Sequence, residues 1–142
     1  MWEVHPLFDL PADPVPFSSL TAYGQSKTAN VLMAVQLNKL LSSEGILAFS
    51  LNPGIVTSTG EKALVTDEMA AKLEAVFGPP KTIDQGAATV VVAALDPGLK
   101  GGEAVWLVDC QISDQIPPSS TDAQLAEKLW KLSEEIIREK LG

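Results

Sequence analysis

The sequence predicts an α/β fold in which two short parallel strands are joined through helices. Segments with helical periodicity alternate with two short apolar runs, residues 46–52 and 104–108, that show no helical period. Runs of this kind are typical of strands buried on both faces of a sheet. Two such strands connected through helices form a parallel pair with a right-handed crossover.

Composition and charge narrow the classes of function. The chain has 142 residues, of which 46% are hydrophobic, so it can bury a core and is not a disordered tail. A net charge of −8 argues against binding to nucleic acid or to an anionic membrane surface. One cysteine, Cys110, and one histidine, His5, provide neither a disulfide framework nor a metal cluster. We expect a reducing, cytoplasmic compartment.

The start of the chain differs from the rest. Residues 1–20 are rich in proline, which forbids a continuous helix or a central strand, and they lack the basic start and apolar stretch of a signal peptide. We interpret them as a loop or tail, and residues 21–142 as part of a single domain. A long helix opens this part. Thr21 can cap its start, and Gly45 lies just past its end.

Capping and stop signals define the next two helices. Residues 67–77 should form a helix, because Thr66 can cap it and the Gly-Pro-Pro sequence at 78–80 stops it. Thr82 and Gln85 then form the pattern of a capping box. The helix that they open is apolar on almost every face, so we expect it inside the protein or under another layer.

The last helix is amphipathic and should run over residues 121–141. Its apolar stripe consists of Leu125, Leu129, Leu132 and Ile136. Two strands make a thin sheet, and the long helices carry more apolar surface than two strands can cover. The sequence therefore reads as part of a larger fold.

One pair of side chains points to catalysis. Tyr23, the only tyrosine, and Lys27 are four residues apart, which places both on one face of a helix. A free phenol has a pKa of about 10, and a neighbouring ammonium lowers the pKa, so the tyrosine can act as a general acid or base on a carbonyl or alcohol. The pair alone is weak evidence, since a surface tyrosine beneath a solvated lysine gives the same pattern.

Two further features favour the chemical interpretation. Ser26 and Asn30 extend the polar stripe, which then runs into Ala34 and Leu37, two positions expected in the core. The strand over 46–52 ends shortly afterwards in Asn-Pro-Gly, and ligands of open α/β sheets bind beyond the carboxyl ends of strands.

Several motifs occur in one order along most of the chain. They are A-Y-G-Q-S-K at 22–27, L-N-P-G at 51–54, D-Q-G-A at 84–87, V-D-C at 108–110 and K-L-W-K-L-S-E at 128–134. In this order they resemble the short-chain dehydrogenase/reductase family, in its retinol-dehydrogenase-like and WW-domain-oxidoreductase-like branch. The resemblance implies the C-terminal half of a Rossmann-type, doubly wound parallel sheet.

The resemblance also implies an activity. Tyr23 corresponds to the family's catalytic acid/base, and Lys27 to the lysine that lowers the tyrosine pKa and binds the nicotinamide ribose. Both would touch the cofactor, NAD or NADP. The implied reaction interconverts an alcohol and a carbonyl on a small molecule, and apolar side chains in the family's lid segment could form a wall for a lipophilic substrate.

Residues after the first strand correspond to the cofactor side of the site. Pro53 and Gly54 match the turn that lets the backbone approach the nicotinamide, although an ordinary turn would look the same. Val56 matches the residue whose N–H meets the carboxamide, and Ser58 stands where the family has a threonine. The family's substrate lid would cover residues 57–80. Its apolar side chains, which core packing explains more simply, are Met69, Leu73, Val76 and Phe77.

The sequence departs from the family pattern before Tyr23. It has no Gly-rich turn that opens a helix and cradles the pyrophosphate, and no serine a dozen or more residues before the tyrosine. We therefore expect a chain without the N-terminal Gly-rich half, which binds cofactor weakly or not at all by itself. The strand over 46–52 would then have an unpaired edge.

Three interpretations follow. The first is a truncated NAD(P)-dependent oxidoreductase that uses Tyr23 and Lys27. The second is a non-catalytic interaction module that forms a homo- or heterodimer through the helix over residues 22–42. The third is a wrongly assigned gene start.

Overall fold

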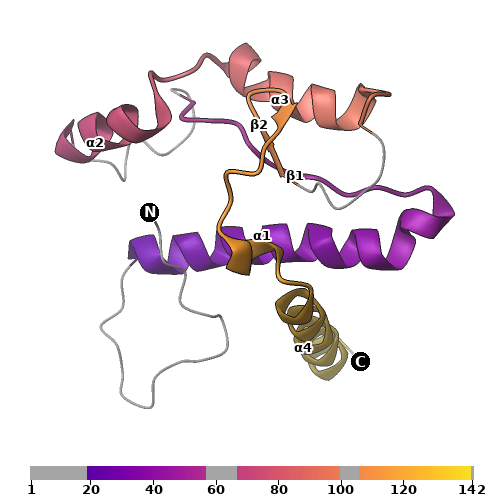
Figure 1. Cartoon of the computed structure of the whole chain (residues 1–142). Coiled ribbons are helices and arrows are strands. Elements are labelled where there is room, and N and C mark those ends of the chain that lie inside the picture. Colours follow the sequence, from indigo (N-terminus) through magenta and orange to yellow (C-terminus); the bar gives the residue numbers. More distant parts are fainter. Residues whose placement is uncertain (1–18, 57–66, 100–105, 142) are drawn as a thin grey trace. The chain divides into compact units, whose positions relative to one another are not determined.

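The computed structural model describes residues 19–56, 67–99 and 106–141 (Figure 1). These residues form two compact units, whose positions relative to one another are not determined. The first unit contains residues 19–50 and 115–141, and the second contains the remainder. The predicted proline-rich tail lies, up to residue 18, outside the described residues, so its conformation stays a prediction.

The first unit is built on helix α1, Ser19–Leu41. The helix begins before Thr21, so the prediction that Thr21 caps it is wrong. A 3-10 turn, η1 (Ser42–Glu44), follows, and Gly45 ends it in the left-handed conformation with a φ of 78°. The stop signal at Gly45 is confirmed, because a residue without Cβ adopts that conformation at no steric cost.

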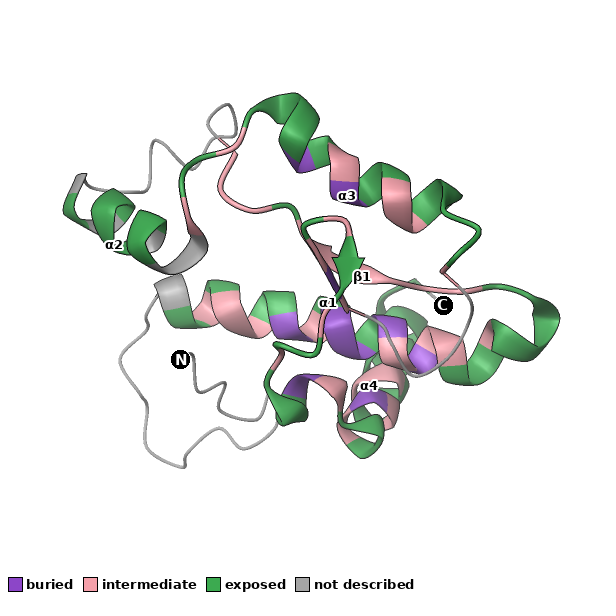
Figure 2. Cartoon of the chain, turned by 45° about the horizontal axis from the view of Figure 1, so that its top comes forward, coloured by how far each residue is buried: buried purple, intermediate pink, exposed green. Residues whose placement is uncertain are grey.

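Helix α1 contacts helix α4, Ala123–Leu141, and the short 3-10 helix η3, Pro118–Thr121, that precedes it. Buried residues of this unit lie on all three elements (Figure 2). The predicted apolar stripe of α4 is buried only in part: Leu132 and Ile136 are exposed. All residues of α4 from Lys131 to Leu141 are exposed, and the buried and half-buried residues of α4, which contacts α1, lie in its first turns.

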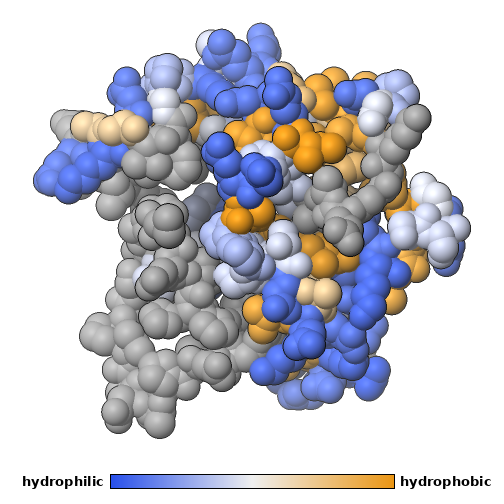
Figure 3. Space-filling model, in the orientation of Figure 1, coloured by the Kyte–Doolittle hydropathy of each residue, from blue (hydrophilic) through white to orange (hydrophobic). Residues whose placement is uncertain are grey.

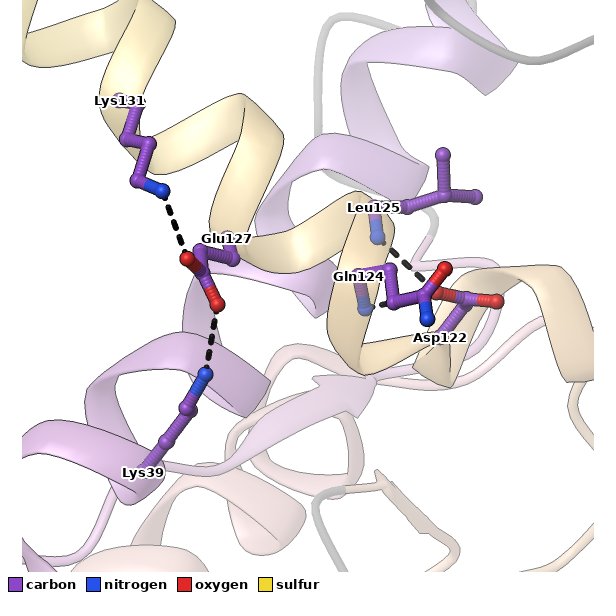
Figure 4. A network of polar contacts seen from close by, with 6 residues as sticks. All are labelled: Lys39, Asp122, Gln124, Leu125, Glu127 and Lys131. Atoms are coloured by element: carbon purple, nitrogen blue, oxygen red, sulfur yellow. Dashed lines mark hydrogen bonds and ion pairs between the residues drawn. The ribbon is translucent and has the colours of Figure 1, made fainter.

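A polar network borders the contact between α1 and α4 (Figure 4). Glu127 accepts one hydrogen bond from Lys131 and one from Lys39 on α1, each at 2.7 Å between nitrogen and oxygen. The hydrogen bonds from Lys131 and Lys39, and then their positive charges, lower the pKa of Glu127 to about 2. Asp122 caps α4 by accepting hydrogen bonds from the backbone N–H groups of Gln124 and Leu125, at 2.8 and 2.9 Å.

The second unit carries a small sheet with the strand order β1-β2-β3. Its strands are β1 (Ser50–Asn52), β2 (Trp106–Val108) and β3 (Gln111–Ile112). Strands β2 and β3 are antiparallel, and the sheet is mixed. The α/β class is confirmed, whereas the prediction of two strands is wrong. The added strand β3 forms because Asp109 and Cys110 take left-handed conformations, with φ of 50° and 64°, and close a two-residue hairpin.

Strand β1 is shorter than the predicted strand over 46–52. Residues 46–49 are not in a strand, and Ile46 is exposed, so burial on both faces is also wrong. The cause is the side chain of Asn38, which donates to the Ala48 carbonyl at 2.8 Å and accepts from the Ala48 N–H at 2.7 Å. An amide side chain thereby takes the backbone groups that a neighbouring strand would use.

Helices α2 (Asp67–Phe77) and α3 (Ile83–Leu95) lie where the sequence predicts them. The capping box is confirmed: Thr82 accepts from the Gln85 N–H at 3.2 Å, and the Gln85 side chain accepts from the Thr82 N–H at 2.9 Å. No described helix is both long and apolar enough to cross a membrane.

The prediction that α3 is enclosed is wrong. Its buried residues are Gly86 and Thr89, and the helix contacts β2. Other positions of the helix leave large apolar side chains exposed, and Figure 3 shows apolar surface in the area of α3. These side chains are Ile83, Val90, Val91 and Leu95, the last with 75% of its surface exposed.

Candidate active site

The predicted catalytic pair is brought together on α1. The Nζ atom of Lys27 lies 5.1 Å from the centroid of the Tyr23 ring, one turn along the helix. This is within the range of a cation–π contact. Both side chains are exposed, and 53% of the Tyr23 surface is open to solvent. The pair is therefore accessible to a small molecule.

The rest of the polar stripe is also exposed, and it meets the core at Ala34, which is buried. Ser26 donates its hydroxyl proton to the backbone carbonyl of Tyr23, with 2.7 Å between the oxygens. A serine in mid-helix commonly forms such a bond to the preceding turn. Asn30 is exposed, and Leu37 is half-buried rather than in the core.

The second part of the predicted site is the 53–56 segment, Pro53 to Val56, which directly follows β1. Gly54 has a φ of 78°, and its N–H donates to the Asn52 side chain, 2.9 Å from Oδ1. An asparagine that binds the backbone two residues on forms a compact turn. The positive φ of Gly54 and this hydrogen bond shape the backbone after β1, and the role of Pro53 and Gly54 at the nicotinamide stays a prediction.

Two neighbours fix the end of this segment. Val56 forms a parallel β-bridge with Lys81, whose N–H donates to the Ile55 carbonyl at 2.7 Å. Helix α3 approaches at Gly86, where a Cβ atom would lie 2.5 Å from a methyl carbon of Val56. Only a residue without a side chain allows this approach, so Gly86 sets how closely α3 packs on Val56.

The side chain of Lys81 extends over the turn itself. A Cβ atom at Gly54 would lie 2.9 Å from Cε of Lys81, and the Lys81 ammonium forms an ion pair with Asp109. Neither Lys81 nor the role of Asp109 is predicted from the sequence. A lysine between a Pro-Pro stop and a helix cap has no pattern that indicates what it binds.

Other predicted residues are not described. Ser58 lies outside the described residues, as do the side chains of the proposed lid wall, Met69, Leu73, Val76 and Phe77. Their assignments stay predictions. Tyr23 and Lys27 belong to the first compact unit and the 53–56 segment to the second, so each part of the site stands by itself.

The chain is similar to several curated proteins. It is 36% identical over 135 residues to the short-chain dehydrogenase TIC 32 B, chloroplastic, of Brassica napus, which covers 92% of this chain and 41% of that protein. It is 33% identical over 117 residues to retinol dehydrogenase 12 of Bos taurus, and the alignment covers 82% of this chain and 36% of that protein. It is 30% identical over 125 residues to the WW domain-containing oxidoreductase of Homo sapiens, and the alignment covers 87% of this chain and 30% of that protein.

The chain thus spans about two-fifths or less of the length of these curated relatives. No family model and no solved structure matches it. The predicted resemblance is nevertheless confirmed, because three relatives with oxidoreductase names align with most of the chain. This chain belongs to the short-chain dehydrogenase/reductase family.

Proposed function

We propose that this chain acts in an NAD(P)-dependent oxidoreductase that interconverts an alcohol and a carbonyl, with Tyr23 and Lys27 as its acid–base pair. The observation that carries the proposal is the Lys27 ammonium 5.1 Å from the ring centroid of an exposed tyrosine. The dehydrogenase and oxidoreductase names of the relatives support the reaction class. A lipophilic substrate and a cytoplasmic location belong to the same proposal, although one relative is chloroplastic by name.

The residues fit the nicotinamide end of such a cofactor. Gly54 has no side chain after β1, and the exposed ammonium of Lys27 has donors that can bind ribose hydroxyls. Pro53, Val56 and Ser58 would complete the cofactor side of the site. When bound, the nicotinamide supplies or accepts the hydride. The 142 residues include no Gly-rich turn for the pyrophosphate, so the fit is confined to the nicotinamide end.

The two side chains of the pair have different tasks. In reduction, the Tyr23 hydroxyl gives its proton to the carbonyl oxygen, and in oxidation the phenolate takes the proton of the alcohol. Negative charge therefore develops on the Tyr23 oxygen during reduction. The Lys27 ammonium stabilises that charge, because it lies over the same ring.

The test is turnover by the full chain with NADH or NADPH and a series of aldehydes and ketones of increasing chain length. Tyr23→Phe should lower turnover by about 100-fold or more, because it removes the proton donor. Its unfolding midpoint should be unchanged, because the side chain is exposed. Ser26→Ala is the matched control on the same face and should keep its turnover. Equal turnover in Tyr23→Phe, or none in the wild-type chain, would contradict the proposal.

A second candidate function is association through α1. Met33, Leu37 and Leu40 are spaced along one face of the helix, and Met33 and Leu40 expose 52% and 44% of their surface. Apolar side chains in such a row favour a helical partner. Light scattering should then show a dimer that becomes a monomer in Met33→Glu/Leu40→Glu. A wild-type chain that is monomeric at high concentration excludes self-association.

A further inference from the structure

Lys81 contacts three consecutive residues of the second unit. Its backbone N–H donates to the Ile55 carbonyl at 2.7 Å, and its backbone pairs with Val56. Its side chain passes over Gly54, where an added Cβ atom would lie 2.9 Å from Cε and 3.0 Å from Nζ. The 53–56 segment is therefore held by one residue through both backbone and side chain.

The other end of the Lys81 side chain reaches a hairpin that is itself fixed. Lys81 pairs with Asp109, which forms the β2–β3 turn together with Cys110. Both turn residues have positive φ, a conformation that residues other than glycine seldom adopt. Thr89, with 1% of its surface exposed, accepts the N–H of Cys110 at 3.2 Å and ties the turn to α3. Asp109 is thus a fixed point for the lysine.

We propose that Lys81 is a positioning residue for the nicotinamide side of the active site. Through its ion pair with Asp109, it couples the hairpin to the 53–56 segment and fixes the backbone on which the nicotinamide would lie. This role rests on the proposed oxidoreductase function. The Lys81 side chain is 23% exposed and the Asp109 side chain 70% exposed, so the pair is partly open to solvent and to the ions that screen it.

The primary test is amide hydrogen exchange by NMR in the full chain. The reporters are the Lys81 and Gly54 N–H groups, which bind the Ile55 carbonyl and the Asn52 side chain. Asp109→Asn keeps the size of the residue and its tolerance of positive φ but removes the charge. Both reporters should exchange about fivefold faster, a loss typical of a partly exposed ion pair. Unchanged exchange at both reporters would overturn the proposal.

Two further variants separate positioning from general stability. Lys81→Met keeps the aliphatic stem without the ammonium and should behave like Asp109→Asn, whereas Lys81→Arg should keep slow exchange. Glu68→Gln breaks the exposed Glu68–Lys72 pair on α2 and is the matched control, which should leave both reporters unchanged. If Lys81→Met or the control Glu68→Gln accelerates exchange throughout the second unit, Lys81 has only a structural role.

The salt dependence of amide exchange distinguishes an ion pair from an apolar contact. Raising salt from about 0.05 to about 0.5 M should accelerate the two reporters in the wild-type chain, because ions screen the pair. The same salt step should have no effect on them in Asp109→Asn. Salt-independent exchange in the wild-type chain would contradict a role for the ion pair.

Cofactor binding distinguishes this proposal from the proposed function. NADH binding, followed by its fluorescence, should weaken about fivefold in Asp109→Asn, in proportion to the loosened backbone. If the wild-type chain does not bind NADH but the exchange results hold, the coupling of the hairpin to the 53–56 segment stands and the proposed function fails. If NADH binds equally well to both proteins, the function stands and the positioning role fails.

Discussion

The Tyr23–Lys27 pair and the 53–56 segment, each in its own compact unit, are built in opposite ways. Tyr23 and Lys27 are exposed side chains on a long helix, and a ring contact joins them. The 53–56 segment is backbone that is fixed by the Asn52 side chain, by Lys81 and by the close approach of α3 at Gly86. Substitutions in the first part should therefore change chemistry with little effect on folding. Substitutions around the second should change folding or backbone geometry first.

After Tyr23→Phe, the largest effect is expected at Lys27. Lys27→Met removes the charge above the Tyr23 ring and should lower turnover by about 100-fold, because the developing phenolate loses its partner. Lys27→Arg keeps a cation and should retain more turnover than Lys27→Met. The unfolding midpoint of both should match the wild type, which steady-state kinetics and urea unfolding would show together. A large loss of stability in either variant would contradict the claim that the Tyr23–Lys27 pair affects chemistry with little effect on folding.

Glycine substitutions compare how tightly the 53–56 segment and helix α1 are packed. Gly86→Ala places a methyl group 2.5 Å from Val56, so it should destabilise the chain by about 1–3 kcal/mol. Gly24→Ala in α1 is the matched control, since no atom lies within 4 Å of its added Cβ, and it should stabilise the chain by about 0.5–1 kcal/mol. Urea unfolding measures both. Equal effects would show that α3 does not pack tightly on Val56.

Buried threonines sharpen the same contrast. Thr89→Val removes the acceptor of the Cys110 N–H, and it should cost about 1 kcal/mol in unfolding free energy and loosen the β2–β3 hairpin. Thr28→Val in α1 is matched in shape and burial. Its hydroxyl only adds a bond to the Gly24 carbonyl within the helix, so its loss should cost less. A larger effect at Thr28 would contradict the importance assigned to the hairpin.

The cap of α4 should matter less than the buried contacts. Asp122→Ala leaves the N–H groups of Gln124 and Leu125 without their carboxylate acceptor, which should cost about 1 kcal/mol or less. Asp122→Asn should restore most of the loss. Thermal unfolding followed by circular dichroism measures both, and turnover should not change in either variant.

The smallest effect concerns pH. The pKa of Glu127 is lowered from 4.5 to about 2 by its bonds to Lys131 and Lys39, so the folded state favours the charged carboxylate. This stabilisation is complete above about pH 4.5 and is lost as the pH falls toward 2. Glu127→Gln should remove this part of the pH dependence, as measured by urea unfolding across that range. Identical pH profiles would show that the link between α1 and α4 contributes nothing.

Local signals predicted the helices well. The capping box of Thr82 and Gln85, and the glycine stop at Gly45, depend on neighbouring residues only, and both are present in the structure. The pairing of Tyr23 with Lys27 follows from helical geometry in the same way.

Features that depend on distant residues were not predicted. The apolar run over 46–52 predicts a strand. The side chain of Asn38, however, forms hydrogen bonds with both backbone groups of Ala48, so this part of the run does not pair with a neighbouring strand. The β2–β3 hairpin has Asp109 and Cys110 at positions where glycine or asparagine would be the usual signal. Lys81 acquires its partners only when the 53–56 segment and the hairpin come together in space.

Transfer of deuterium from 4-deuterated NADH or NADPH to a carbonyl compound tests the central claim most directly. Mass spectrometry of the alcohol accumulates signal over long incubation, so it detects slow turnover that absorbance would miss. The full wild-type chain should produce alcohol carrying one deuterium, and Tyr23→Phe should produce at least about 100-fold less. Two results would contradict the assignment of Tyr23 and Lys27 as the acid–base pair. One is equal labelling of the alcohol by both proteins, and the other is no deuterated alcohol from the wild-type protein with either cofactor.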